Sequence, residues 1–196
     1  MSDDTPARQP TIKPLENGPL MVRDVGSLTN SRGETLESKS RLFLCRCGGS
    51  AKKPFCDNSH AGNGFSSANE RDASADVREG YTAADLAIHD DRTVCAHIGF
   101  CSDGLPSVFK LRTEPWIDPA GADAEAVAEV VQLCPSGALS YSIAGEEHGD
   151  VDRAPAVVVS RDGPYFVVGG VELETEGWGE GASREHYALV PLRQVA

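Results

Sequence analysis

Six cysteines and a nearby histidine are the side chains of this sequence with the clearest capacity for chemistry. Three cysteines and the histidine fall within one short stretch, CRCGGSAKKPFCDNSH, as Cys45, Cys47, Cys56 and His60. The other three cysteines follow later in the chain: Cys95, Cys101 and Cys134. Thiolates and imidazoles bind zinc and iron, and thiols also form disulfides. For the first stretch, spacing alone leaves a disulfide knot, a zinc site and an iron–sulfur cluster open.

The sequence favours metal or redox use of the cysteines over disulfides. The N-terminus, MSDDTPARQP, has neither a basic n-region nor an apolar h-region, so we expect a cytoplasmic location. Disulfides rarely persist in that reducing compartment. Two sets of three cysteines also suit two metal sites better than disulfides within each set.

Charge and hydropathy narrow the range of partners. The 196 residues carry a formal net charge of −12, whereas nucleic acids and anionic membranes require a positive protein face. No apolar run approaches the roughly 20 residues that a membrane span needs. We therefore expect no nucleic-acid or membrane partner. A basic docking protein suits the charge better, with solubility alone as the alternative explanation.

The first set of ligands has a distinctive spacing, C-x-C-x8-C-x3-H, with Ser50 and Pro54 between the second and third cysteines and Asp57 directly after the third. Over residues 11–65 the chain resembles the CDGSH (mitoNEET-type) iron–sulfur family. The resemblance implies a 2Fe-2S cluster held by Cys45, Cys47, Cys56 and His60. A Cys3His zinc site is the alternative, because the same ligands would serve zinc.

One position departs from the family pattern and one ligand changes the expected chemistry. Asn58 stands where the family has glycine, and we expect the turn to persist because asparagine tolerates a left-handed backbone. His60 replaces a thiolate, which raises the expected potential of a 2Fe-2S cluster above that of plant-type ferredoxins. An imidazole ligand also offers a site for proton-coupled electron transfer and acid lability.

The second set consists of a C-x5-C loop and a distant Cys-Pro. Bacterial ferredoxins use C-x2-C-x2-C here, and this chain has isoleucine at the middle position, which leaves three thiolates. Residues 80–143 resemble divergent single-cluster ferredoxin domains. A 3Fe-4S or 4Fe-4S cluster is therefore expected on Cys95, Cys101 and Cys134, with His97 as either a fourth ligand or a bystander.

Local patterns predict the elements that position these ligands. Short apolar runs in 11–65 indicate brief strands, and polar stretches predict linkers at 66–79 and 144–155. Valines at helical spacing predict a helix that starts at an Asp123 N-cap and delivers Cys134 where Pro135 ends it.

The end of the chain matches its beginning without a gap. With Thr11 placed on Ala156, a Gly-Pro pair in each copy coincides, and Cys45 falls on Val190. We predict that 155–194 is a degenerate β repeat without ligands, against the alternative of a chance alternation of strands. The family resemblance implies dimers that complete each other's β structure, so the chain would be a monomer with an internal pseudo-dimer or a homodimer.

The predicted fold class is α+β, with a β-rich CDGSH-like unit, a ferredoxin-like α+β insert and the C-terminal β repeat. We expect an electron-transfer protein that docks a basic reductase or oxygenase. Nucleotide-binding and hydrolase motifs are missing from the sequence, so an enzyme is not expected. A redox- or pH-labile sensor or cluster donor, and a zinc-stabilised binding module, are the alternatives.

Overall fold

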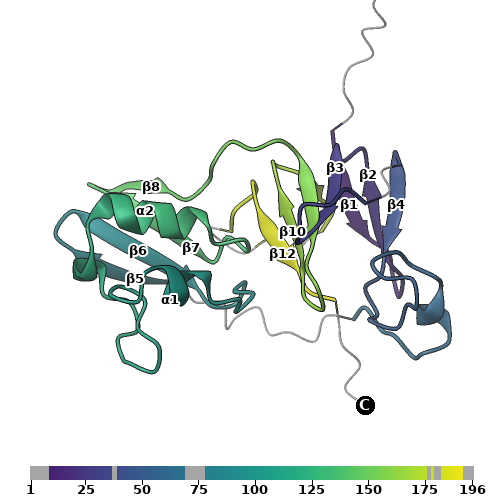
Figure 1. Cartoon of the computed structure of the whole chain (residues 1–196), viewed down its shortest axis with the longest axis horizontal. Helices are drawn as coiled ribbons and strands as arrows, with labels where there is room; N and C mark the ends of the chain where they lie inside the picture. Colours follow the sequence, from purple (N-terminus) through teal and green to yellow (C-terminus); the bar gives the residue numbers. More distant parts are fainter. Residues whose placement is uncertain (1–8, 37–38, 69–77, 176–177, 179–181, 192–196) are drawn as a thin grey trace, which may run out of the picture. The chain divides into compact units, whose positions relative to one another are not determined.

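The computed structural model describes residues 9–36, 39–68, 78–175, 178 and 182–191. By their internal contacts these residues form two compact units with few helices and several small sheets (Figure 1). No helix in the described ranges has the length and the apolar character that a membrane crossing requires.

The two units are not continuous in sequence. The first comprises Met1–Asn69, Arg153–Gly177 and Leu189–Ala196. The second comprises Glu70–Asp152 and Trp178–Ala188. The first unit thus contains segments from both ends of the chain. The second unit contains a central segment and one short segment from late in the sequence.

Two sheets build the first unit. The N-terminal strands are β1 (Thr11–Pro14), β2 (Leu20–Arg23), β3 (Ser27–Asn30) and β4 (Arg41–Leu44). The C-terminal strands are β9 (Ala156–Val159), β10 (Tyr165–Val168) and β11 (Glu172–Leu173), while β12 (Tyr187–Leu189) falls where the division into units passes. One sheet has the order β11-β1-β2-β4, and β10, β9 and β3 are consecutive neighbours in the other.

The two ends of the chain exchange one strand each. The antiparallel pair β1–β2 matches Thr11 with Arg23, and β9–β10 matches Ala156 with Val168, at the same offset of 145 residues that relates Thr11 to Ala156. The parallel pairs follow the offset as well: Thr11 lies opposite Glu172, and Ala156 lies opposite Ser27. Each sheet therefore contains a strand from the other end of the chain.

The turns between these strands share the offset. Asn17 and Asp162 both have positive φ, at 45° and 55°, a conformation that asparagine and aspartate tolerate better than most residues. Each turn closes with a main-chain hydrogen bond, from Leu15 N–H to Pro19 C=O in one and from Ser160 N–H to Pro164 C=O in the other, at 3.0 and 3.3 Å.

Buried side chains repeat in the same way. Ile12, Val157 and Val167 are fully buried, and Val22 is almost fully buried. Ile12, Val157 and Val167 alternate with more exposed neighbours along β1, β9 and β10, as expected for strands with one face in a core.

The second unit is a sheet with helices on it. Its strands are β5 (Arg78–Ala83), β6 (Leu86–Asp91), β7 (Leu139–Ile143) and β8 (Glu146–His148), antiparallel in the order β5-β6-β7-β8. Helix α1 (Phe100–Gly104), the 3-10 turn η3 (Pro119–Gly121) and helix α2 (Ala124–Gln132) lie between β6 and β7 in sequence. Helix α2 packs on the sheet (Figure 1).

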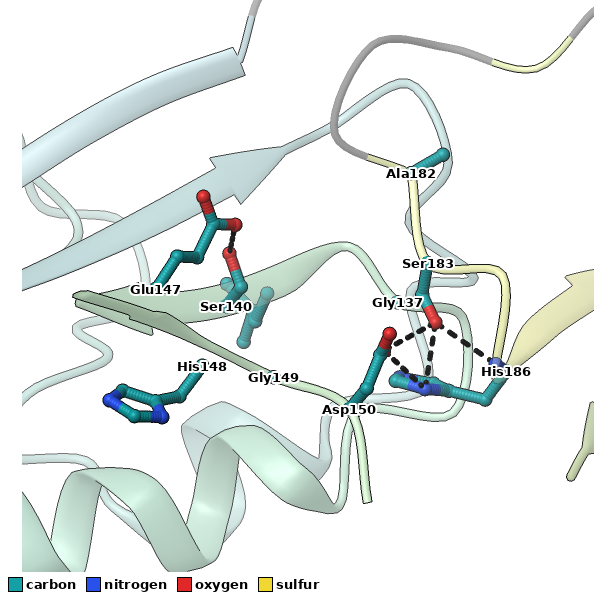
Figure 2. Close-up of a pocket in the computed structure, with 10 residues that line it drawn as sticks. Gly137, Ser140, Glu147, His148, Gly149, Asp150, Ala182, Ser183 and His186 are labelled. Carbon is teal, nitrogen blue, oxygen red and sulfur yellow. Dashed lines mark hydrogen bonds and ion pairs between the residues drawn. The ribbon is translucent and has the colours of Figure 1, made fainter. Parts of the chain in front are cut away.

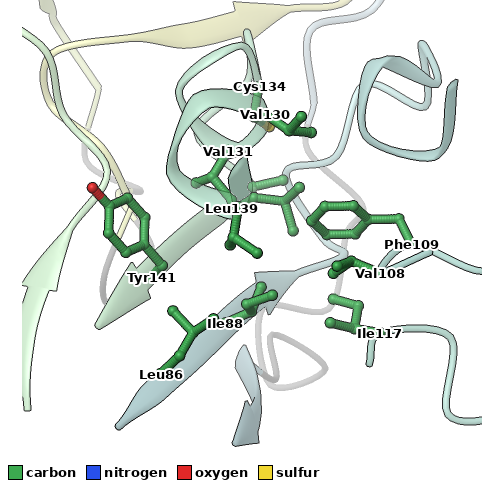
Figure 3. Close-up of a cluster of buried hydrophobic side chains, with 12 residues drawn as sticks. Leu86, Ile88, Val108, Phe109, Ile117, Val130, Val131, Cys134, Leu139 and Tyr141 are labelled. Carbon is green, nitrogen blue, oxygen red and sulfur yellow. The ribbon is translucent and has the colours of Figure 1, made fainter. Parts of the chain in front are cut away.

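The apolar face of α2 and the inner face of the sheet enclose the core of this unit (Figure 3). Ile88, Phe109 and Val131 are fully buried in it. Cys134 belongs to the same core, at the end of α2 beside Val130 (Figure 3). Packing against this core therefore holds Cys134 in place.

Two expectations about this region need correction. Helix α2 ends at Gln132, two residues before Cys134, although the Cys134 N–H still bonds to the Val131 carbonyl at 2.9 Å. The predicted linker 144–155 contains strand β8. A two-residue turn, with φ 51° at Ala144 and 86° at Gly145, folds β8 back onto β7.

The predicted N-cap of α2 is confirmed and gives a test of local stability. The Asp123 carboxylate accepts a hydrogen bond from the Ala126 N–H at 2.9 Å. Because Asp123→Ala leaves that donor without its cap, we expect it to lower the free energy of unfolding by about 1 kcal/mol. Asp123→Asn keeps an acceptor and should retain most of the stability. Denaturant unfolding measures both, and an alanine variant as stable as the parent would contradict the capping role.

Candidate metal centres

Backbone pairing brings the first set of ligands together. Strand β4 ends at Leu44, and the chain returns so that Phe55 lies opposite Leu44 in an isolated antiparallel bridge. The Cys45 N–H donates to the Pro54 carbonyl at 2.7 Å, and the Cys56 N–H donates to the Phe43 carbonyl at 2.8 Å. Cys45 and Cys56 are therefore held on adjacent, hydrogen-bonded segments.

The four ligands form two close pairs. The Sγ atoms of Cys45 and Cys47 lie 3.8 Å apart, and Cys56 Sγ lies 3.5 Å from His60 Nδ1. A tetrahedral ion with metal–sulfur and metal–nitrogen bonds of about 2.3 and 2.0 Å separates two sulfurs by about 3.8 Å, and a sulfur and a nitrogen by about 3.5 Å. Each pair thus has the spacing of two ligands on one metal ion.

The pairs do not converge on a single ion. In the described ranges, the group whose three ligand atoms all lie within 4.8 Å of one another is Asp150, Glu185 and His186, so neither cysteine set is gathered that tightly. One tetrahedral zinc ion would bring every ligand to within about 4 Å of every other. The donor set fits a centre with more than one metal ion.

The loop between the pairs is fixed by its own hydrogen bonds. Asn58 has φ 74°, the left-handed conformation expected of the residue that replaces glycine in the family pattern. The Asp57 carboxylate accepts from the Ser59 hydroxyl at 2.6 Å and from the Ala51 N–H at 2.8 Å. These bonds lower the pKa of Asp57 to about 2, so the carboxylate stays ionised and keeps the loop closed.

Main-chain and side-chain donors also point at the sulfurs. The Gly49 and Asn58 amides lie 3.4 Å from the Sγ atoms of Cys47 and Cys56. Burial raises the pKa of Cys47, but hydrogen bonds from the Gly49 amide and the Asn63 side chain outweigh it and lower the pKa. Such donors stabilise a thiolate and tune a metal bound to it. The sequence pattern did not indicate Asn63.

The second set of cysteines lines one pocket in the second unit. Cys95 follows β6, Cys101 lies in the first turn of α1, and Cys134 follows α2. Gly99, with φ 83°, makes the turn that enters α1. Three different elements therefore direct the three predicted ligands to the same place.

Burial disfavours the ionisation of two of the three thiols in the second pocket. Burial raises the pKa values of Cys95 and Cys101, and nearby thiols add to the effect. A bound metal centre supplies the charge that lets such thiols ionise. His97 is exposed, and its main-chain N–H lies 3.4 Å from Cys95 Sγ, so its imidazole as a fourth ligand stays a prediction.

A charged and aromatic group borders this pocket. Trp116 lines it, and the Arg92 guanidinium lies 3.7 Å from the centre of the indole ring. Arg92 also bonds to the buried Asp90 carboxylate at 2.8 Å. Asp90 and Arg92 are close in sequence, but Trp116 lies in a later segment, so the sequence pattern did not predict this contact.

A further polar pocket surrounds the buried His186 in the second unit (Figure 2). Its Nδ1 atom lies 3.1 Å from Ser183 Oγ and 2.9 Å from a Glu185 oxygen, and Ser183 bonds to Asp150 at 2.6 Å. In a catalytic triad the serine and the acid bind opposite ring nitrogens. Here Ser183 and Glu185 both contact Nδ1, so the group is not arranged as a triad. Its hydrogen bonds hold residues 182–186 beside β8.

Together the two sets of ligands define an iron–sulfur protein with two metal-binding segments. The family described as an iron-binding zinc finger of CDGSH type matches residues 17–61, and the family described as a divergent 4Fe-4S mono-cluster matches residues 81–144. These matches confirm both resemblances seen in the sequence.

Among curated proteins, the chain is similar to the uncharacterized protein YjdI of Escherichia coli strain K12 and of strain O157:H7. Each is 38% identical over 61 residues, which is 31% of this chain and 80% of the relative. The chain belongs to the family of YjdI. No solved structure gives a significant match.

The separation of the ligand sets predicts independent loading. Cys56→Ala should remove metal from the first site and spare the second, and Cys101→Ala should do the reverse, because each ligand set lies within its own compact unit. Iron per chain and the electron paramagnetic resonance spectrum of the remaining site measure this. Loss of iron from both sites in either variant would contradict independence.

Proposed function

We propose that this protein is an electron carrier, with a 2Fe-2S cluster on Cys45, Cys47, Cys56 and His60 and a ferredoxin-type cluster on Cys95, Cys101 and Cys134. The observation that carries the proposal is the pairing of the first four ligands, at 3.8 Å between two sulfurs and 3.5 Å between sulfur and nitrogen. Two such pairs fit two bridged irons and do not fit one zinc ion.

The ligands set the properties of the first site. When bound there, a 2Fe-2S cluster supplies one-electron chemistry. One imidazole in place of a thiolate leaves the site less negative, which favours the reduced state relative to a site of four thiolates. The amides that face Cys47 and Cys56 act in the same direction, because they stabilise negative charge on sulfur.

For the second site we propose a 4Fe-4S cluster, with a 3Fe-4S cluster as the other form that three thiolates can hold. The matching family, described as a divergent 4Fe-4S mono-cluster, supports the first choice. His97 is the proposed fourth ligand, and a small molecule from solvent is the other candidate for that position.

The surroundings support electron transfer over catalysis. Two candidate one-electron sites occur in one chain, and the second lies next to Trp116 and Arg92. Ser183 and His186 lie within hydrogen-bonding distance, but Glu185 contacts the same imidazole nitrogen as the serine, so these described side chains do not form a Ser-His-acid triad. With a net charge of −12, the partner we propose is a basic reductase or oxygenase, and association should weaken as salt rises.

A cluster donor or pH-sensitive sensor is the second candidate. Cys45 and Cys47 are buried, at 3% and 4% exposure, whereas Cys56 and His60 are partly exposed. The pair that contains the imidazole is therefore the one that acid and acceptor proteins can reach. Transfer of the cluster to an apo-acceptor, faster than electron exchange with any partner, would favour this candidate.

Metal analysis of protein purified without oxygen tests the proposal. We expect about five or six irons per chain with comparable acid-labile sulfide, the sum of a 2Fe-2S and a 3Fe-4S or 4Fe-4S centre. About two irons would limit the function to the first site and favour the sensor or donor. Zinc without sulfide would refute both candidates and leave a zinc-stabilised binding module.

Replacing the histidine ligand tests the proton-linked part. His60→Cys should keep a cluster but lower its midpoint potential, because a neutral ligand becomes an anionic one. It should also remove the pH dependence of the potential near neutrality, since the ionisable imidazole is gone. Protein-film voltammetry across pH measures both effects. A pH dependence unchanged by the substitution would exclude His60 as the proton site.

A further inference from the structure

One tyrosine from the C-terminal end of the chain contacts the segment that carries the first set of ligands, residues 45–60, which we call the cradle. Tyr165 begins β10 and is only 4% exposed. Its hydroxyl donates to the Cys45 carbonyl at 2.7 Å, and the Pro54 carbonyl lies 3.4 Å from the same oxygen. Cys45 and Tyr165 are 120 residues apart in sequence but lie in the same compact unit.

The bonded carbonyls belong to the part of the cradle that sets its shape. The Pro54 carbonyl also accepts the Cys45 N–H, which ties the two ends of the loop that leads from Cys45 to Cys56. Cys45 and Tyr165 are both buried. The Tyr165 hydroxyl contacts both carbonyls and therefore holds the two ends of this loop together. Because the contact is buried, water does not compete for it.

The exchange of strands explains how Tyr165 arrives there. Strand β3 of the N-terminal segment pairs with β9, and β9 pairs with β10. In return, β11 pairs with β1. The C-terminal segment is thus built into the same unit as the first metal site, and its own equivalent of Cys45 is Val190.

The two ends of the chain carry different residues at the position of Tyr165, and the difference matches which end carries the metal ligands. The equivalent of Tyr165 at the N-terminal end is Leu20, which is equally buried at 3% exposure. Leucine has no donor. The hydroxyl therefore occurs in the segment that lacks ligands and points at the segment that has them.

We propose that Tyr165, supplied by the ligand-free C-terminal segment, is a positioning residue of the first metal site. The Tyr165 hydroxyl fixes the main chain at Cys45, and the positive end of its O–H dipole points toward the Cys45 carbonyl. That orientation slows opening of the loop and favours added negative charge at the site. The identity of the metal centre rests on the proposed function, but the bracing role does not.

Tyr165→Phe is the sharpest test, because it removes the hydroxyl and keeps the ring in the core. Tyr141→Phe is the matched control: Tyr141 is also a buried strand tyrosine, at 7% exposure, but it lies in the second unit. Tyr165→Leu, which copies the residue at position 20, is a second variant. The readouts are the rate of metal release to a chelator at mildly acidic pH, and the midpoint potential of the first site.

We expect Tyr165→Phe to release metal from the first site about three- to tenfold faster, the range that one net hydrogen bond corresponds to. The midpoint potential should fall, while release from the second site stays unchanged. Tyr165→Leu should match or exceed this effect, and Tyr141→Phe should leave the first site as in the parent.

Equal release rates and potentials in Tyr165→Phe and the parent would overturn the proposal, and so would an equal acceleration at both sites. The ratio of rates can be measured whichever metal the parent holds. Sulfide analysis of the parent reports separately on the proposed function, so failure of one is distinguishable from failure of the other.

Discussion

The antiparallel contact between residues 43–45 and 54–56 is the constraint on which the first site depends. Two main-chain hydrogen bonds, from Cys45 to Pro54 and from Cys56 to Phe43, set two ligand-bearing segments side by side. Everything else in the cradle adds to this contact: the Asp57 carboxylate closes the loop, and the Tyr165 hydroxyl braces its base. The ligands then form two pairs.

The second site rests on a different physical basis. A sheet and helix α2 enclose an apolar core that includes Cys134, and Cys95 and Cys101 pack against this core. The three cysteines line one pocket. Burial there disfavours free thiolates, so a cationic centre and the buried thiols stabilise each other. The chain therefore contains one site held by main-chain hydrogen bonds and another held by packing. The proposed electron transfer would use both sites.

Sequence reasoning went furthest where chemistry is local. Ligand types and spacing predicted two sets of ligands, the Asp123 cap follows from its neighbours, and the left-handed turn at Asn58 follows from the family pattern. It failed for β8, because a turn at Ala144 with positive φ has no strong signal in the letters. It also missed Asn63 and Tyr165, because contacts over long sequence distances depend on strand pairing that local periodicity does not specify. The shared offset of the two ends was visible in the sequence, and the family resemblance implied units that complete each other's β structure. Neither specified that β3 and β11 are the strands exchanged.

The central claim is that the first site holds two metal ions on two unlike ligand pairs. A Mössbauer spectrum of the iron-loaded Cys101→Ala variant tests it most directly, because iron should then occupy the first site alone. The account predicts two iron environments in equal amounts, one with sulfur ligands only and one with a nitrogen ligand. A single iron environment, or a site that takes up zinc and no iron, would contradict it.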